Sequence, residues 1–227
     1  MQRLGIVHTV SQLAPTFADL AGELLPGVEL TVIADELLLK RTVRDGGLDD
    51  FTRSRLNSHV SALTDFGVDA VLVTCSSLGG VVDEIDAAAV IPVVRVDRAM
   101  AERAVVLGAR IGVLATLPTT LAPTTELVEA AAQEAGTAVE AVARICDGAF
   151  AALERGDRSR HDAIIGEELD RLASEVDVVV LAQASMARIA AARSEDGPPV
   201  LSSPRLAMEK MAGARTSGGA AVHQQLR

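Results

Sequence analysis

A cysteine stands directly after an apolar run that is expected to form a parallel strand. Cys75 follows residues 70–74 (AVLVT) and precedes residues 76–80 (SSLGG), a turn rich in hydroxyls and glycine. A helix that begins at such a turn points its N–H groups toward the strand end, which favours a thiolate and binds anions. We therefore predict that Cys75 has a functional role, in a position that favours its thiolate. The alternative is a buried small hydrophobe, as most free cysteines are.

The other expected strand ends carry small and mostly uncharged polar residues. In an open parallel sheet, ligands bind beyond the carboxyl ends of the strands. This rule selects as substrate-binding candidates His8, Thr9, Ser11, Ser76, Ser77, Thr116, Thr119, Thr120, Ala184 and Ser185. Hydroxyls and helix N–H groups hold carboxylates, so the expected ligand is a small carboxylic acid. For His8, a neutral hydrogen-bonded structural role is the alternative to orienting or protonating that ligand.

Other reactive residue types occupy positions that favour structural roles. Cys146 follows a different strand without a hydroxyl-rich turn, and His59 and His161 fall on predicted helices, where we expect surface positions. For Arg95 and Arg98 we expect surface salt bridges, with a part in carboxylate binding as the alternative. No group of His, Cys, Asp and Glu has the spacing of metal ligands, and no phosphate or dinucleotide motif occurs. We therefore predict no metal site.

Short runs rich in β-branched residues alternate along the chain with longer Ala- and Leu-rich stretches. The runs are continuously apolar, which is typical of parallel strands covered on both faces. Strands are predicted at residues 4–8, 28–33, 70–74, 92–96, 111–115, 139–143, 178–181 and 200–202. The stretches between them predict helices, among them 12–25, 48–66, 98–107, 119–135, 161–174 and 204–212. Loops are expected at 156–160 and 193–199, and a frayed tail at 214–227.

Three segments recur in the second half of the chain in the same order. Residues 4–9 (LGIVHT) match 111–116 (IGVLAT), 69–77 (DAVLVTCSS) match 177–185 (DVVVLAQAS), and 91–94 (IPVV) match 198–201 (PPVL). The distance along the chain between the two copies is the same for all three segments to within one residue. This favours an internal repeat over the general likeness of α/β units. We predict two four-stranded, doubly wound, flavodoxin-like α/β halves related by a pseudo-two-fold axis, with a cleft between them. Residues 1–97 with 207–227 would form the half with Cys75, and 98–206 the half with Gln183.

Composition excludes several classes of function. The 227 residues are 49% hydrophobic but only 2% aromatic, so the core must be aliphatic. With 21 basic and 31 acidic residues the net charge is -10, which argues against a nucleic-acid partner. Two cysteines cannot form a disulfide framework, and no apolar run is long enough to cross a membrane. We expect a soluble, reduced, cytoplasmic protein.

The thiol at a strand end and the repeat resemble the aspartate/glutamate racemase superfamily, which includes hydantoin racemases, maleate isomerase and arylmalonate decarboxylase. The resemblance covers the chain from Arg3 to about Met211 and is sharpest in residues 69–77 and 177–186. It implies two cysteines that face each other across the substrate α-carbon, one removing the proton and the other returning it, without a cofactor. Cys75 takes the place of the first thiol. The superfamily also implies a homodimer or a larger homo-oligomer.

The second segment departs from the family pattern, because Gln183 stands where the other thiol is expected. An amide does not titrate near neutral pH, although it can donate a hydrogen bond to a carboxylate or a developing enolate. We therefore expect a cofactor-independent enzyme of isomerase type in which Cys75 transfers protons on one face of a carbon next to a carboxylate. The alternatives are a cofactor-free decarboxylase of a malonate-like or oxo acid, and a non-catalytic carboxylate-binding sensor.

Overall fold

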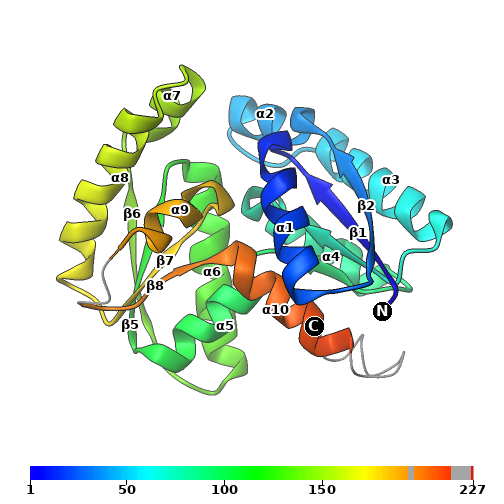
Figure 1. Ribbon diagram of the computed structural model, residues 1–227. Helices are drawn as coiled ribbons and strands as arrows, with labels where there is room; N and C mark the ends of the chain where they lie inside the picture. The colour runs from blue at the N-terminus through cyan, green and yellow to red at the C-terminus, as the bar shows by residue number, and fades with distance from the viewer. Residues whose placement is uncertain (194–196, 216–225, 227) are drawn as a thin grey trace. The chain divides into compact units, whose positions relative to one another are not determined.

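The computed structural model describes residues 1–193, 197–215 and 226, and in it the chain forms two compact units (Figure 1). One unit comprises Met1–Val96 with Pro204–Arg227, and the other comprises Asp97–Ser203. Each contains one four-stranded sheet in which all the pairs are parallel. The predicted α/β class with two parallel sheets is confirmed. Among the described residues no helix is long and apolar enough to cross a membrane.

The first sheet has the strand order β2-β1-β3-β4. Its strands are β1 (Arg3–His8), β2 (Glu29–Ala34), β3 (Ala70–Val73) and β4 (Val93–Arg95). The helices of this unit are η1 (Ser11–Leu13), α1 (Ala14–Leu24), α2 (Glu36–Asp45), α3 (Asp50–Phe66), η2 (Ser76–Leu78), α4 (Gly79–Ala88) and α10 (Ser203–Arg215).

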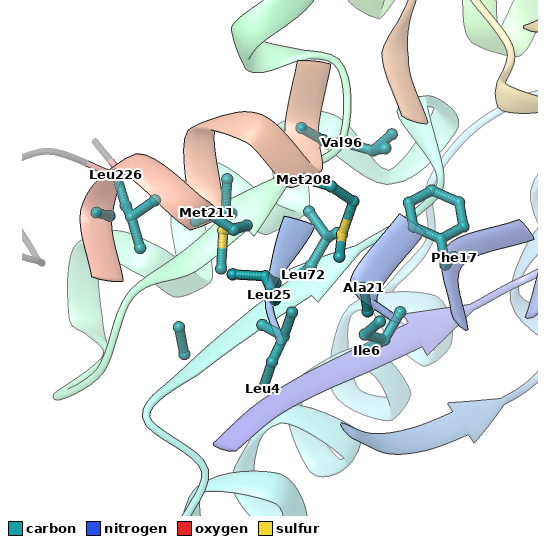
Figure 2. Packing of buried hydrophobic residues seen from close by; sticks show 14 residues of the cluster. Leu4, Ile6, Phe17, Ala21, Leu25, Leu72, Val96, Met208, Met211 and Leu226 are labelled. Atoms are coloured by element: carbon teal, nitrogen blue, oxygen red, sulfur yellow. The ribbon is translucent and has the colours of Figure 1, made fainter. Parts of the chain in front are cut away.

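Helices cover both faces of this sheet because its strands bury side chains on both sides. On one face, Leu4 and Ile6 of β1 pack with Phe17 of α1 and with Met208 and Met211 of α10 (Figure 2). On the other face, the alternate strand residues Val7, Val71 and Val73 pack against α2, α3 and α4. Continuous burial explains why the strands read as unbroken apolar runs.

The second sheet has the equivalent order β6-β5-β7-β8. Its strands are β5 (Arg110–Ala115), β6 (Glu140–Ile145), β7 (Val178–Leu181) and β8 (Val200–Ser202). The helices of this unit are α5 (Arg98–Leu107), α6 (Pro118–Glu134), α7 (Ala149–Glu154), α8 (Arg158–Ala173), η3 (Ala184–Met186) and α9 (Ala187–Ala191). Helices α7 and α8 pack on one face over a core that contains Leu114, Val179 and Leu181.

The repeated aspartates that open two of the matching segments have the same structural role in both units. Asp69 Oδ2 accepts hydrogen bonds from the backbone N–H groups of Gln2 and of Arg3, the latter at 2.9 Å. Asp177 Oδ2 likewise accepts from Ala109 at 3.0 Å and from Arg110 at 2.8 Å. Each carboxylate thereby binds the N–H groups at the start of the central strand of its sheet.

Two expected loops and the expected tail differ in part from the structure. The segment 156–160 is not a loop throughout, because α8 begins at Arg158 with the Asp157 carboxylate capping its first turn. The tail does not begin at residue 214, since α10 continues to Arg215 and buries Ala214. Residues 194–196 of the other loop, and residues 216–225 and 227 of the tail, lie outside the described residues.

Candidate functional site

Cys75 lies at the carboxyl end of the first sheet. The backbone N–H of Thr74 donates to the Val7 carbonyl at 3.0 Å, so strand pairing continues to the residue before the thiol. Cys75 is still extended, with φ -138° and ψ 105°, and η2 begins at the next residue. Its side chain is 7% exposed and packs on the face of the sheet that carries Val7 and Val73.

The turn after Cys75 contains a buried hydroxyl with no partner. Ser76 is 5% exposed, and its Oγ has no hydrogen-bond partner among the described residues. Leaving a buried polar group unpaired costs free energy, so such a group needs a special reason. A ligand oxygen or nitrogen bound next to Cys75 would satisfy this hydroxyl. Ser77 of the same turn is also buried.

His8 also lies at this end of the sheet, but on the opposite face from Cys75. Strand alternation places it with Leu4 and Ile6, and its ring centroid is 5.3 Å from that of Phe17. Its Nδ1 is 2.7 Å from Thr74 Oγ1, which itself donates to a backbone carbonyl. The other ring nitrogen, Nε2, is buried and has no partner among the described residues. Burial lowers the pKa of His8 to about 4, so the ring is neutral at pH 7.

The two other candidates after β1 differ in their surroundings. Thr9 is buried at 3% exposure, next to His8. Ser11 is exposed, and its hydroxyl donates to the Glu36 carboxylate at the start of α2. The structure therefore places Thr9 with the buried residues at the sheet end and Ser11 outside them.

In the second unit, Gln183 occupies the position that corresponds to Cys75, just beyond β7. Its Oε1 accepts a hydrogen bond from the backbone N–H of Thr116 at 2.7 Å, and its Nε2 donates to Thr116 Oγ1 at 2.8 Å. Thr116 and Thr120 are buried at 7% and 2% exposure, and Thr119 Oγ1 is a buried hydroxyl without a partner in the described part of the chain. Ala184 presents a methyl group where the first unit has Ser76.

Comparison with known proteins identifies the family. The family model of Asp/Glu/hydantoin racemases matches residues 13–211, which is most of the chain. The chain belongs to the Asp/Glu/hydantoin racemase family. No curated protein sequence matches it significantly. The predictions of a racemase-superfamily enzyme and of its fold are confirmed at this level.

Solved structures of other racemases share the fold of this family member. Glutamate racemase from Bacillus anthracis is 18% identical with a TM-score of 0.76, and the match covers 95% of this chain and 82% of that one. Allantoin racemase from Klebsiella pneumoniae is 20% identical with a TM-score of 0.70, covering 95% and 88%. Aspartate racemase from Picrophilus torridus is 15% identical with a TM-score of 0.68, covering 94% and 95%.

Arg95 of this racemase-family chain is not the surface residue that the sequence suggested. It is 6% exposed, and its guanidinium binds the Asp83 carboxylate at 2.8 Å. A Cβ atom at Gly79 would lie 2.2 Å from Arg95 Nη2, so only glycine leaves room for the guanidinium there. Arg95 therefore places a buried positive charge against the first residue of α4, in the segment that follows Cys75. Arg98, by contrast, forms ion pairs with Glu102 and Glu134.

His161 is fully buried, so the expected surface position is wrong. Its Nδ1 lies 2.7 Å from Asp162 Oδ1, and its Nε2 has no partner within the described ranges. Arg188 binds Asp162 Oδ2 at 3.0 Å and donates to the Ser185 carbonyl at 2.9 Å, so it ties α8 to the turn after Gln183. Burial opposes ionisation of Asp162, but Arg188 and His161 hold its pKa below the ordinary value.

The carboxyl end of the first sheet carries a further acidic residue, Asp35, which the sequence did not single out as a candidate. Asp35 follows β2, is 7% exposed, and accepts hydrogen bonds from Arg55 and, at 2.6 Å, from His59 Nε2. Burial opposes its ionisation, yet these hydrogen bonds lower its pKa. His59 is therefore half-buried and hydrogen-bonded to a carboxylate. Cys146 is 1% exposed, and burial raises its pKa to about 12, which fits the structural role expected for it.

Proposed function

We propose that this chain is a cofactor-independent enzyme of isomerase type that uses the Cys75 thiol to move a proton at a carbon next to a carboxylate. The observation that supports this most is that Cys75 is followed, at the start of η2, by a buried hydroxyl, Ser76 Oγ, that has no partner among the described residues. Membership of the racemase family supports the same class of chemistry. Gln183 at the corresponding position is the reason for proposing transfer on one face only.

The proposed reaction starts with the Cys75 thiolate. The thiolate removes the α-proton as the C–H electron pair moves into the carboxylate, which becomes an enediolate. Ser76 Oγ–H and the N–H groups at the start of η2 and α4 stabilise the developing negative charge. The Cys75 thiol then returns a proton to the same face. Return to the same carbon only exchanges the hydrogen with solvent and keeps the configuration, because a carboxamide such as Gln183 cannot serve as an acid or a base on the other face at neutral pH. Net isomerisation therefore requires the proton to return to a different carbon of the enediolate.

A second candidate function is decarboxylation of a malonate-like or oxo acid. A single acid group suffices there, because loss of carbon dioxide itself leaves the carbanion that Cys75 would protonate. The presence of one sheet-end thiol, with a glutamine at the other position, favours this candidate over two-base racemisation.

The test is proton NMR in heavy water with a panel of small acids: amino acids, hydantoins, malonates, maleate, and hydroxy- or oxo-diacids. We expect one compound to exchange its α-proton or to convert, and Cys75→Ser to abolish this. Cys146→Ser is the matched control and should retain activity, because that thiol is buried elsewhere. Full activity in Cys75→Ser would contradict the proposal. Binding without exchange or conversion in the unmodified chain would favour a carboxylate sensor.

A further inference from the structure

The contact between Gln183 and Thr116 is not used by the proposed proton transfer. The regular pairing of β5 and β7 ends with the Ala182 N–H, which donates to the Leu114 carbonyl at 2.9 Å. Beyond it, the Gln183 carboxamide takes the place of a further peptide group. It accepts from the Thr116 N–H and donates to the Thr116 hydroxyl, at 2.7 and 2.8 Å. Both ends of the carboxamide are therefore engaged by one residue.

The groups that hold this carboxamide also suit a carboxylate. A carboxamide and a carboxylate are both planar, and a backbone N–H binds an oxygen of either. The Thr116 hydroxyl accepts from Gln183 Nε2, but it can rotate and donate to a carboxylate oxygen instead. Thr119, on the first turn of α6, adds a buried hydroxyl without a partner among the described residues. This hydroxyl can donate to a further oxygen.

The first unit has a shorter side chain, that of Cys75, at the corresponding position. Val7 pairs with Val73 as Leu114 pairs with Leu181, so Cys75 and Gln183 follow equivalent strand ends. The glutamine side chain extends beyond the length of a cysteine, which allows it to fold back onto the neighbouring strand end. Ser76 of the first unit has a hydroxyl without a partner in the part of the chain that the structure describes, whereas Ala184 has no hydroxyl.

We propose that the Gln183 carboxamide is a built-in occupant of a carboxylate-binding site formed by the Thr116 N–H, the Thr116 hydroxyl and the Thr119 hydroxyl. A ligand carboxylate reaches this site only when the carboxamide leaves. Two hydrogen bonds must then be replaced, which lowers the affinity for the carboxylate by about tenfold. The inference rests on the proposed function, since it concerns how the second unit holds the same class of ligand.

The test measures binding of malonate at Thr116 by NMR. The Thr116 amide signal of threonine-labelled protein, assigned with Thr116→Ser, is followed as malonate is added. In Gln183→Met, which keeps the length of the side chain but not its hydrogen bonds, we expect the signal to shift in the free protein. We also expect malonate to bind there about tenfold more tightly than in the unmodified chain. Gln183→Glu keeps an acceptor for the Thr116 N–H and should gain no affinity.

The matched control is Gln133→Met, because Gln133 is an exposed glutamine near the end of α6. An unchanged Thr116 signal in Gln183→Met would mean that the contact is absent, and would overturn the inference. A shifted signal with unchanged malonate affinity would overturn it too, since the carboxamide would then obstruct nothing. The malonate titration measures binding alone and needs no catalytic turnover. It is repeated in the Cys75→Ser variant. Failure of the Cys75 chemistry and failure of this inference are therefore separate results.

Discussion

His8 Nδ1 and Thr74 Oγ1 lie 2.7 Å apart at the ends of two neighbouring strands, and this contact joins the buried imidazole to β3. Burial lowers the pKa of His8 to about 4, so the ring is neutral at pH 7. A neutral ring buried against Phe17 has a consequence for stability at low pH.

We predict that the native state loses stability as the pH falls because of His8. Burial lowers its pKa from 6.5 to about 4. Between these values the unfolded chain binds a proton that the native chain does not, so the free energy of unfolding falls as the pH falls. From pH 7 to about pH 4 the loss through this residue is at most about 3 kcal/mol.

The measurement is urea unfolding across this pH range for the unmodified chain and for His8→Gln. The amide of the variant can still donate to Thr74 but does not titrate. We expect the variant to lose less stability on acidification. Equal pH dependence in the two proteins would show that His8 is not the group responsible.

Gly79→Ala should destabilise the first unit by about 1–3 kcal/mol. The new methyl group would meet the buried Arg95 guanidinium at 2.2 Å, and the ion pair with Asp83 restricts its retreat. Gly80→Ala is the matched control, since nothing lies within 4 Å of its Cβ. In thermal unfolding the control should be neutral or slightly stabilising, because alanine favours a helix interior. A neutral Gly79→Ala would show that Arg95 moves away freely.

The two thiols should differ in reactivity toward iodoacetamide in the native protein. Burial raises the pKa of Cys146 to about 12, so almost none of it is thiolate near neutral pH. We expect mass spectrometry to find alkylation at Cys75 first, and none at Cys146 until the chain unfolds. Cys75→Ser should then remain unmodified under native conditions. Labelling of Cys146 in that variant would contradict the prediction.

His161→Ala should destabilise the second unit by about 2–4 kcal/mol, more than His59→Ala destabilises the first. His161 is fully buried and its removal leaves a cavity, while the Asp162 carboxylate loses a partner. His59 retains partial contact with solvent, and Arg55 still binds Asp35 after its removal. Chemical unfolding of the two variants compares the effects. A smaller loss for His161→Ala would count against the burial of this ring.

The strands were predictable to within a residue or two because their apolar runs are buried on both faces. The recurrence of segments 4–9 and 69–77 also anticipated the equal strand orders of the two sheets. The expected surface position of His161 is wrong, although the spacing of apolar residues in the sequence indicates its burial. It stands four residues before Ile165 and eight before Leu169, on the stripe by which α8 faces the core. This period indicates a buried position even for a polar residue type such as histidine.

Other features had no signal in a single sequence. The burial of Arg95 depends on space above Gly79 and on a carboxylate twelve positions away, which are properties of packing. The contact of Gln183 with Thr116 joins residues 67 positions apart and depends on a side-chain conformation. The position of Gln183 was predictable from the repeat, but the partner of its amide was not.

Helix α10 has a consequence for the order in which the chain can fold. Met208 and Met211 cover the same face of the first sheet as Phe17 (Figure 2). Residues 97–203, which form the second unit, are contiguous and leave the ribosome together, whereas the core of the first unit is not closed until α10 has been made. During synthesis the part of the β1, β3 and β4 face that α10 covers is therefore exposed while the whole second unit is being made. We expect nascent chains stopped before Ser203 to bind chaperones through this face.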